Sequence, residues 1–183
     1  MTNNTVLKRI GILIPILVFA LGTGCSKNDA IPNHPVEVKF QLLNTAGEST
    51  TTFQEGKDIL FRLEIKNLSD QAISLLNFRP YDGQLFLVKN SSGDGQKIGS
   101  PLNLVVQVID IYGYSIPHNK SYLLVVSWTG DEEKSLVPEG WRVDYSNNEF
   151  LPPGKYVVEF TFDATFWDFD IPQKKFKVEF EVN

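Results

Sequence analysis

The stretch ILFRLEIK, residues 59–66, decides the fold of this chain. Apolar side chains occupy every second position from Ile59 to Ile65, and charged residues stand between them from Arg62 onward. Successive side chains of a β-strand point to opposite faces of a sheet, so this period of two predicts a strand with one buried face. Antiparallel sheets with one solvated side are typical of such strands.

The same alternation recurs in three other parts of the chain, at residues 36–42, 156–162 and 176–182. Further strands are expected at Ala72–Leu76, Leu85–Lys89, Leu104–Ile111 and Tyr122–Trp128. The last two are almost continuously apolar, which favours a central place in a sheet. Turn-forming residues separate the strands, and no helical periodicity follows residue 25. We therefore expect residues 36–183 to form one all-β domain, an antiparallel β-sandwich of about seven to nine strands.

The N-terminal residues have the three-part organisation of a secretory signal. The cations Lys8 and Arg9 precede the apolar run Ile10–Leu21, and the small residues 22–24 follow it. A membrane-spanning anchor would need about 20 apolar residues. Because this run is shorter and contains Pro15, we expect a cleaved signal peptide over residues 1–24.

The residues at the expected cleavage site, LGTGC at 21–25, resemble a lipobox. This is the motif at which bacterial lipoproteins are cleaved and acylated on the cysteine. Gly22 stands where a branched apolar residue is usual, with Leu21 one position earlier. The resemblance implies a lipid on Cys25, with the membrane as a partner through that lipid. An ordinary secreted protein with a chance cysteine is the alternative.

The cysteine count agrees with lipidation, since Cys25 is the only cysteine and the exported domain can hold no disulfide. The polar residues that follow carry Pro32 and Pro35, so residues 25–35 are expected to be a lipidated tether. Ser26 is not the aspartate associated with inner-membrane retention. The expected location is therefore the cell envelope, anchored by lipid in the outer membrane.

The net charge limits the classes of partner that the domain can bind. Cleavage before Cys25 would remove 24 of the 183 residues, leave 159, and take the formal charge from −5 to −7. Nucleic-acid phosphates require a basic surface, so this acidic domain is not expected to bind nucleic acid.

Two stretches resemble bacterial immunoglobulin-like modules. Residues 53–70, FQEGKDILFRLEIKNLSD, are similar to their second strand, in which a Glu-Gly turn precedes an alternating strand and an Asn–Ser turn ends it. Residues 151–158, LPPGKYVV, are similar to the corner before their penultimate strand. At that corner Gly154 allows a tight reversal. Tyr156 can pack inward and donate its hydroxyl to the backbone upstream, as in a tyrosine corner.

The order of features along residues 36–183 resembles the intracellular proteinase inhibitor (BsuPI-type) domain. These features are Tyr81-Asp82-Gly83, then Ser127-Trp128, then the Pro-Pro-Gly-x-Tyr corner. The resemblance implies an immunoglobulin-like β-sandwich and, as one function, proteinase inhibition. The chain departs from the family in its export signal and in a long insertion, Thr129–Asn148, which would be the candidate inhibitory loop. A cytoplasmic inhibitory role does not carry over to an exported domain.

Residues that could support catalysis are sparse. The only histidines, His34 and His118, have no His or Cys at metal-ligand spacing and are expected to be solvated. No nucleophile elbow, metalloprotease helix or glycine-rich phosphate loop is present. The acidic run 131–133 is typical of a solvated turn. We therefore expect no enzyme activity, no metal and no cofactor.

The candidate binding residues are aromatic. Residues 162–172, FDATFWDFDIP, place Phe166, Trp167 and Phe169 among aspartates, and this segment could present an aromatic platform to a glycan or a protein. The more economical interpretation is that Phe166 and Trp167 cap the open end of the core while the acids keep the connection soluble. Trp141 and Tyr145, in the long insertion, are two further candidates.

Two other interpretations concern neighbouring residues. A calcium loop from Asp163, Asp168 and Asp170 is possible, but it lacks the ligand count of a recognised loop. Trp128, at the end of a predicted strand, is expected in the core, like the buried tryptophan of immunoglobulin-like sandwiches.

The function expected from these features is that of a membrane-anchored, non-catalytic interaction module that binds a protein or a glycan of the envelope. An extracytoplasmic proteinase inhibitor of BsuPI type is the alternative. A small hydrolase with an unrecognised site is a third possibility.

Overall fold

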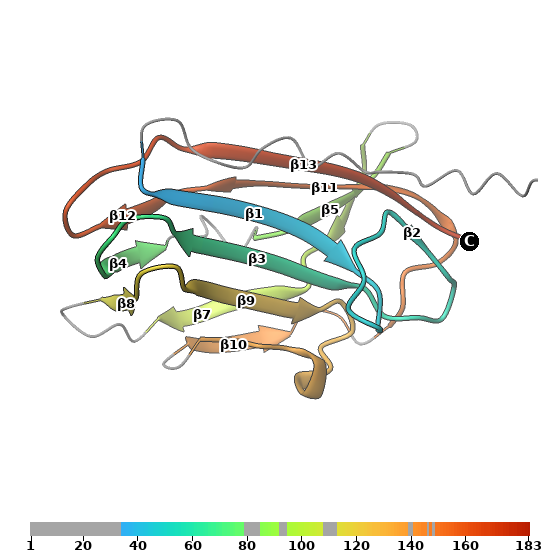
Figure 1. Ribbon diagram of the computed structural model, residues 1–183. Coiled ribbons are helices and arrows are strands. Elements are labelled where there is room, and N and C mark those ends of the chain that lie inside the picture. Colours follow the sequence, from blue (N-terminus) through green and yellow to red (C-terminus); the bar gives the residue numbers. More distant parts are fainter. Residues whose placement is uncertain are drawn as a thin grey trace, which may run out of the picture.

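The computed structural model describes residues 34–78, 85–91, 95–107, 113–138, 141–145, 147 and 149–183. The predicted signal peptide, Cys25, most of the tether and the Tyr81-Asp82-Gly83 turn lie outside these residues. Within them the chain is an all-β sandwich, which confirms the predicted fold class (Figure 1). No helix in this described part is long and apolar enough to cross a membrane.

The described residues contain thirteen strands, of which nine have four residues or more. The strands are β1 (Val36–Leu43), β2 (Thr52–Phe53), β3 (Leu60–Asn67), β4 (Ile73–Phe78), β5 (Leu87–Asn90), β6 (Lys97–Gly99), β7 (Leu102–Gln107), β8 (Tyr114–Ile116), β9 (Ser121–Ser127), β10 (Trp141–Tyr145), β11 (Gly154–Phe162), β12 (Ala164–Phe166) and β13 (Lys174–Val182). One 3-10 turn, η2 (Glu132–Lys134), follows β9.

One layer of the sandwich contains the stretch that decided the fold. β3 lies between β1 and β9, and both pairings are antiparallel. The apolar side chains of β3 are almost fully buried, with Phe61, Leu63 and Ile65 at 0% exposure. Their charged neighbours on the strand are half-buried. The alternation in the sequence therefore corresponds to a core face and a solvated face.

The opposite layer has β11 at its centre. β11 pairs along its full length with β13 and over four residues with β5, antiparallel in both cases. The short β2 adds a parallel partner at the C-terminal end of β13. β11 buries Tyr156, Val158, Phe160 and Phe162, as the sequence predicts.

Aromatic rings fill the space between the two layers. Phe40 of β1 lies 4.9 Å from Phe160 of β11 and 5.1 Å from Phe86, measured between ring centroids. Phe86 has a positive φ of 61°, which is rare for a bulky residue. It is fully buried, so packing holds this backbone conformation in place. Trp128 is 3% exposed and lies 6.0 Å from Phe61, which confirms its expected place in the core.

Two sequence-based expectations need correction. The strands predicted as central are β7 and β9, but in the described part β7 pairs only with β10, and β9 lies at an edge beside β3. The predicted insertion Thr129–Asn148 is not simply a loop, because β10 lies inside it and pairs with β7. The apolar character of β7 and β9 thus does not indicate a central position.

The chain changes layers after β11. β12 begins two residues after β11 ends, and it pairs with β4, which also pairs with β8. The connection from β12 to β13 then returns to the β11 layer. It lies at the same end of the sandwich as the start of β1, at the left of Figure 1.

Candidate functional site

The aromatic residues singled out in the sequence belong to two parts of the chain, β10 and the segment from β12 to β13. Phe166, Trp167 and Phe169 lie together on β12 and the connection that follows it. Tyr145, at the end of β10, lies instead beside Gly130, whose missing Cβ would stand 2.8 Å from the Cβ of Tyr145. Trp141 begins β10, opposite Gln107, and its side chain lies outside the described part.

Phe166 and Phe169 pack the connection between β12 and β13 against the core. Phe166 is 2% exposed, so it belongs to the core and is not available to a partner. Phe169 stacks on it with ring centroids 4.7 Å apart and an interplanar angle of 13°. Phe169 is itself partly buried against the core. The expected cap on the core is therefore correct for Phe166, on which Phe169 stacks, and wrong for Trp167, whose side chain is exposed.

Trp167 is different, because its side chain is 62% exposed, the highest value among the large hydrophobic residues described as exposed. Its backbone is nevertheless fixed. The amide of Trp167 donates to the carbonyl of Ser74 at 2.9 Å, which extends the pairing of β12 with β4. A bridge between Thr165 and Asp170 closes the turn around it. An exposed indole on a fixed backbone loses little conformational freedom when a partner binds.

Three aspartates lie close to Trp167 in the sequence. Asp168 and Asp170 are exposed, and neither carboxylate is bonded to another residue in the described part. Asp163 accepts a hydrogen bond of 3.0 Å from the side-chain amide of Gln173. Within the described residues, the three aspartates do not form a group that could hold a metal ion. The calcium interpretation therefore has no geometric support.

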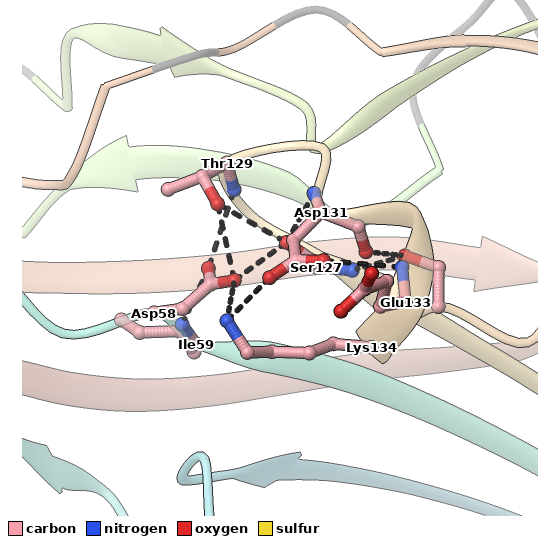
Figure 2. Close-up of polar contacts among 8 residues, drawn as sticks. Asp58, Ile59, Ser127, Thr129, Asp131, Glu133 and Lys134 are labelled. Carbon is pink, nitrogen blue, oxygen red and sulfur yellow. Dashed lines mark hydrogen bonds and ion pairs between the residues drawn. The ribbon is translucent and has the colours of Figure 1, made fainter.

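A second polar cluster, around the buried Asp58, was not anticipated from the sequence. Asp58 is 3% exposed and precedes β3 (Figure 2). Its carboxylate accepts hydrogen bonds from the Ser127 hydroxyl at 2.6 Å and from the Thr129 hydroxyl at 3.1 Å. It also accepts from the backbone amides of Thr129 at 3.2 Å and Ile59 at 2.9 Å. The ammonium of Lys134 lies 4.0 Å away.

The contacts of the Asp58 cluster indicate a structural role. Ser127 is fully buried and donates directly to a carboxylate, with no histidine between them to accept its proton. The hydrogen bond of Lys134 to Asp131 raises the pKa of its ammonium and so favours the charged form. The same hydrogen bond lowers the pKa of Asp131. The cluster therefore fixes the turn after β9 and offers no nucleophile.

The start of the predicted inhibitory loop is tied to this cluster. Asp131 caps η2 by accepting from the amide of Glu133 at 3.1 Å, and the amide of Asp131 donates to Ser127. Leu136 then bridges to β9: its amide and carbonyl both bond the backbone of Val125, at 2.8 and 2.9 Å. Its side chain is 52% exposed, but its backbone is already paired.

The corner before β11 has the hydrogen bond of a tyrosine corner. The Tyr156 hydroxyl donates to the carbonyl of Pro152 at 2.7 Å. Burial raises the pKa of this phenol. A Cβ on Gly154 would stand 3.1 Å from the same hydroxyl, so the glycine leaves room for it. Gly154 and Tyr156 thus serve the fold.

The histidines do not contribute a site. His118 is exposed on the turn between β8 and β9, where its Nδ1 contacts the carbonyl of Ser69 and its Nε2 lies 2.6 Å from the Asn119 amide. His34 is half-buried at the first described position.

Comparison with known proteins adds little to the geometry. No family model and no curated protein matches this chain. A solved structure described as "X-ray structure of Northeast Structural Genomics Consortium target SoR45" is similar, at 16% sequence identity and a TM-score of 0.30. The similarity covers 80% of this chain and 88% of that chain.

Proposed function

We propose that this chain is a lipid-anchored, non-catalytic interaction module of the bacterial cell envelope, with an immunoglobulin-like domain that binds a partner through Trp167. The observation that carries the proposal is the exposed indole of Trp167 on a backbone fixed to β4. Tryptophan is enriched at the centres of protein interfaces because it buries a large area at low entropic cost. A partner that covers Trp167 would gain that burial without first ordering the connection.

A binding role agrees with the chemistry of the described residues. Two groups of polar side chains in the described part are the Asp58 cluster, whose members bond one another, and the aspartates before and after β12. Neither combines a nucleophile with a base. An interaction module needs no such pair, only a fixed and accessible surface.

The start of β1 and the β12–β13 connection lie at the same end of the domain (Figure 1). The carbonyl of Pro35 accepts a hydrogen bond of 2.7 Å from the amide of Leu68, just after β3. The next strand, β4, carries Ser74, which holds Trp167. With lipid on Cys25, about ten residues would join the membrane to this end, a reach of roughly 35 Å at full extension. The partner therefore lies close to the membrane surface.

Proteinase inhibition has less support from the geometry. An inhibitory loop commonly enters a protease cleft as an extended segment that pairs with it through backbone hydrogen bonds. At Leu136 those backbone groups already bond Val125. Further along the same segment, the β10 backbone pairs with β7. In the described part of Thr129–Asn148, the backbone is thus paired at Leu136 and along one edge of β10.

Recovery of the partner from cells tests the proposal. The full chain would be solubilised from membranes with a mild detergent in three forms: unaltered, Trp167→Ala and Phe150→Ala. Phe150 is the matched control, since it is an aromatic residue with 50% exposure outside the β12–β13 connection. We expect one envelope component to be retained by the unaltered chain and by Phe150→Ala but lost from Trp167→Ala. Equal recovery by all three forms would contradict the assigned surface.

Lipidation is tested separately. Cells that express the chain would be grown with labelled palmitate, with Cys25→Ser as the control. We expect label on the unaltered chain only. Label that persists in Cys25→Ser would exclude the proposed anchor.

A further inference from the structure

We infer that the surface around Trp167 recognises a cationic segment of a partner protein, in which arginine or lysine side chains meet the indole and the carboxylates of Asp168 and Asp170. This inference rests on the proposed function and names the chemistry of the partner. Three observations support it: the exposure of the indole, the two exposed aspartates on the same short connection, and the fixed backbone.

The indole supplies the first part of this recognition. A cation placed over an aromatic face is attracted by the ring quadrupole, and tryptophan is the most favourable ring. Trp167 has the exposure that such a contact needs. A cationic side chain also brings an apolar stem that can cover the indole while its charged head stays at the rim.

The carboxylates supply the second part. Asp168 follows Trp167 directly and Asp170 closes the turn by its bridge to Thr165, so both lie on the same short connection as the indole. Both are exposed and have no bonded partner in the described part. A guanidinium can bond a carboxylate through two parallel N–H groups, so arginine suits this surface. Complementary charge would also speed the encounter with such a segment.

The same charges argue against the membrane itself as the occupant. The surface lies at the end of the domain nearest the expected anchor, so lipid headgroups would be its nearest neighbours. Exposed carboxylates are repelled by an anionic lipid surface, whereas they attract a basic protein segment near it. A cationic protein at the membrane surface therefore fits both the position and the charge.

The test measures binding of defined probes to the full mature chain in detergent micelles. The indole resonance of Trp167, assigned by its loss in Trp167→Phe, would be followed while a decapeptide of alternating arginine and serine is added. A decapeptide of alternating glutamate and serine is the control probe. Vesicles of phosphatidylethanolamine and phosphatidylglycerol and a soluble peptidoglycan fragment are added in parallel. We expect the arginine peptide alone to shift this resonance.

Two double variants with the same change in net charge separate local recognition from general attraction. The double variant Asp168→Asn with Asp170→Asn should reduce the affinity for the arginine peptide by about five-fold or more. Glu132→Gln with Glu133→Gln, on the exposed η2 turn, should leave its affinity within about two-fold. Equal weakening in both double variants, or a stronger response to the acidic peptide, the vesicles or the glycan, would overturn the inference.

Failure of this inference is distinguishable from failure of the proposed function. A cellular partner that depends on Trp167 but is indifferent to the Asp168 and Asp170 substitutions would overturn only the cationic partner. The absence of any Trp167-dependent partner would overturn both.

Discussion

The carboxylate of Asp58 accepts a hydrogen bond of 2.6 Å from the hydroxyl of Ser127, a residue 69 positions further along the chain. The contact joins the residues just before β3 to the last residue of β9. Both side chains are almost fully buried. The bond therefore fixes where the β3–β9 pairing ends and how the chain turns toward η2.

Asp58→Ala should strongly destabilise the domain. The substitution leaves the buried Ser127 hydroxyl and the half-buried Thr129 amide without their acceptor, and each polar group left unsatisfied costs about 1–3 kcal/mol. For a domain of this size, that loss lowers the Tm by about 10 °C. Thermal unfolding followed by circular dichroism measures the change. Asp70→Ala, on the exposed turn after β3, is the matched control, and an equal shift in both variants would show that the cluster has no special role.

Removal of the hydroxyl from Tyr156 and from Tyr122 should change the free energy of unfolding in different ways. Tyr156→Phe removes a hydrogen bond to Pro152 and should reduce the free energy of unfolding by about 1 kcal/mol. Tyr122 has a buried hydroxyl without a hydrogen-bond partner in the described part, and burial raises its pKa. Tyr122→Phe removes that unpaired group, so stability should stay the same or rise. Denaturant titration of both variants checks the contrast, and a larger loss for Tyr122→Phe would refute it.

Stability should depend on pH through Glu159. Lys89 donates a hydrogen bond of 2.7 Å to Glu159, and this bond, with the attraction of the two charges, lowers the pKa of the carboxyl. A carboxyl whose pKa is lower in the folded than in the unfolded state stabilises the fold at pH values above its unfolded pKa. This contribution is lost as the pH falls through the folded pKa. The loss should begin below the ordinary glutamate pKa of about 4.3.

The measurement compares Glu159→Gln with the unaltered chain by denaturant titration from pH 7 to pH 3. The variant should be less stable at pH 7, and the difference should shrink as the pH falls. Glu55→Gln is the control, because Glu55 is exposed on the turn between β2 and β3 and has no ion pair in the described part. A difference that stays constant with pH would argue against the ion pair as its source.

The long strands could be predicted because their evidence is local. β1, β3, β11 and β13 alternate apolar and polar residues over seven to nine positions, and one face of each is buried. β10 carries the same signal in WRVDY, with apolar residues at every second position. Five residues inside a polar insertion nevertheless give too weak a pattern to predict a strand, and their pairing with β7 depends on distant sequence.

The Asp58 cluster and the different burial of Phe166 and Trp167 could not be predicted, because they depend on residues that are distant in the sequence. Next to Lys57, Asp58 has the appearance of a solvated turn residue, and its burial depends on Ser127 and Thr129, which the fold brings to it. Phe166 and Trp167 are adjacent aromatics, so composition gave both the same role. The pairing of β12 with β4 directs one into the core and leaves the other exposed.

The most direct test of the account is photo-crosslinking at position 167 in living cells. A photoreactive residue would replace Trp167 in the full chain, or Phe150 in a matched control, with Cys25 intact. We expect a discrete adduct with one envelope protein from position 167 and none from position 150. The same adducts from both positions, or none from position 167, would contradict it.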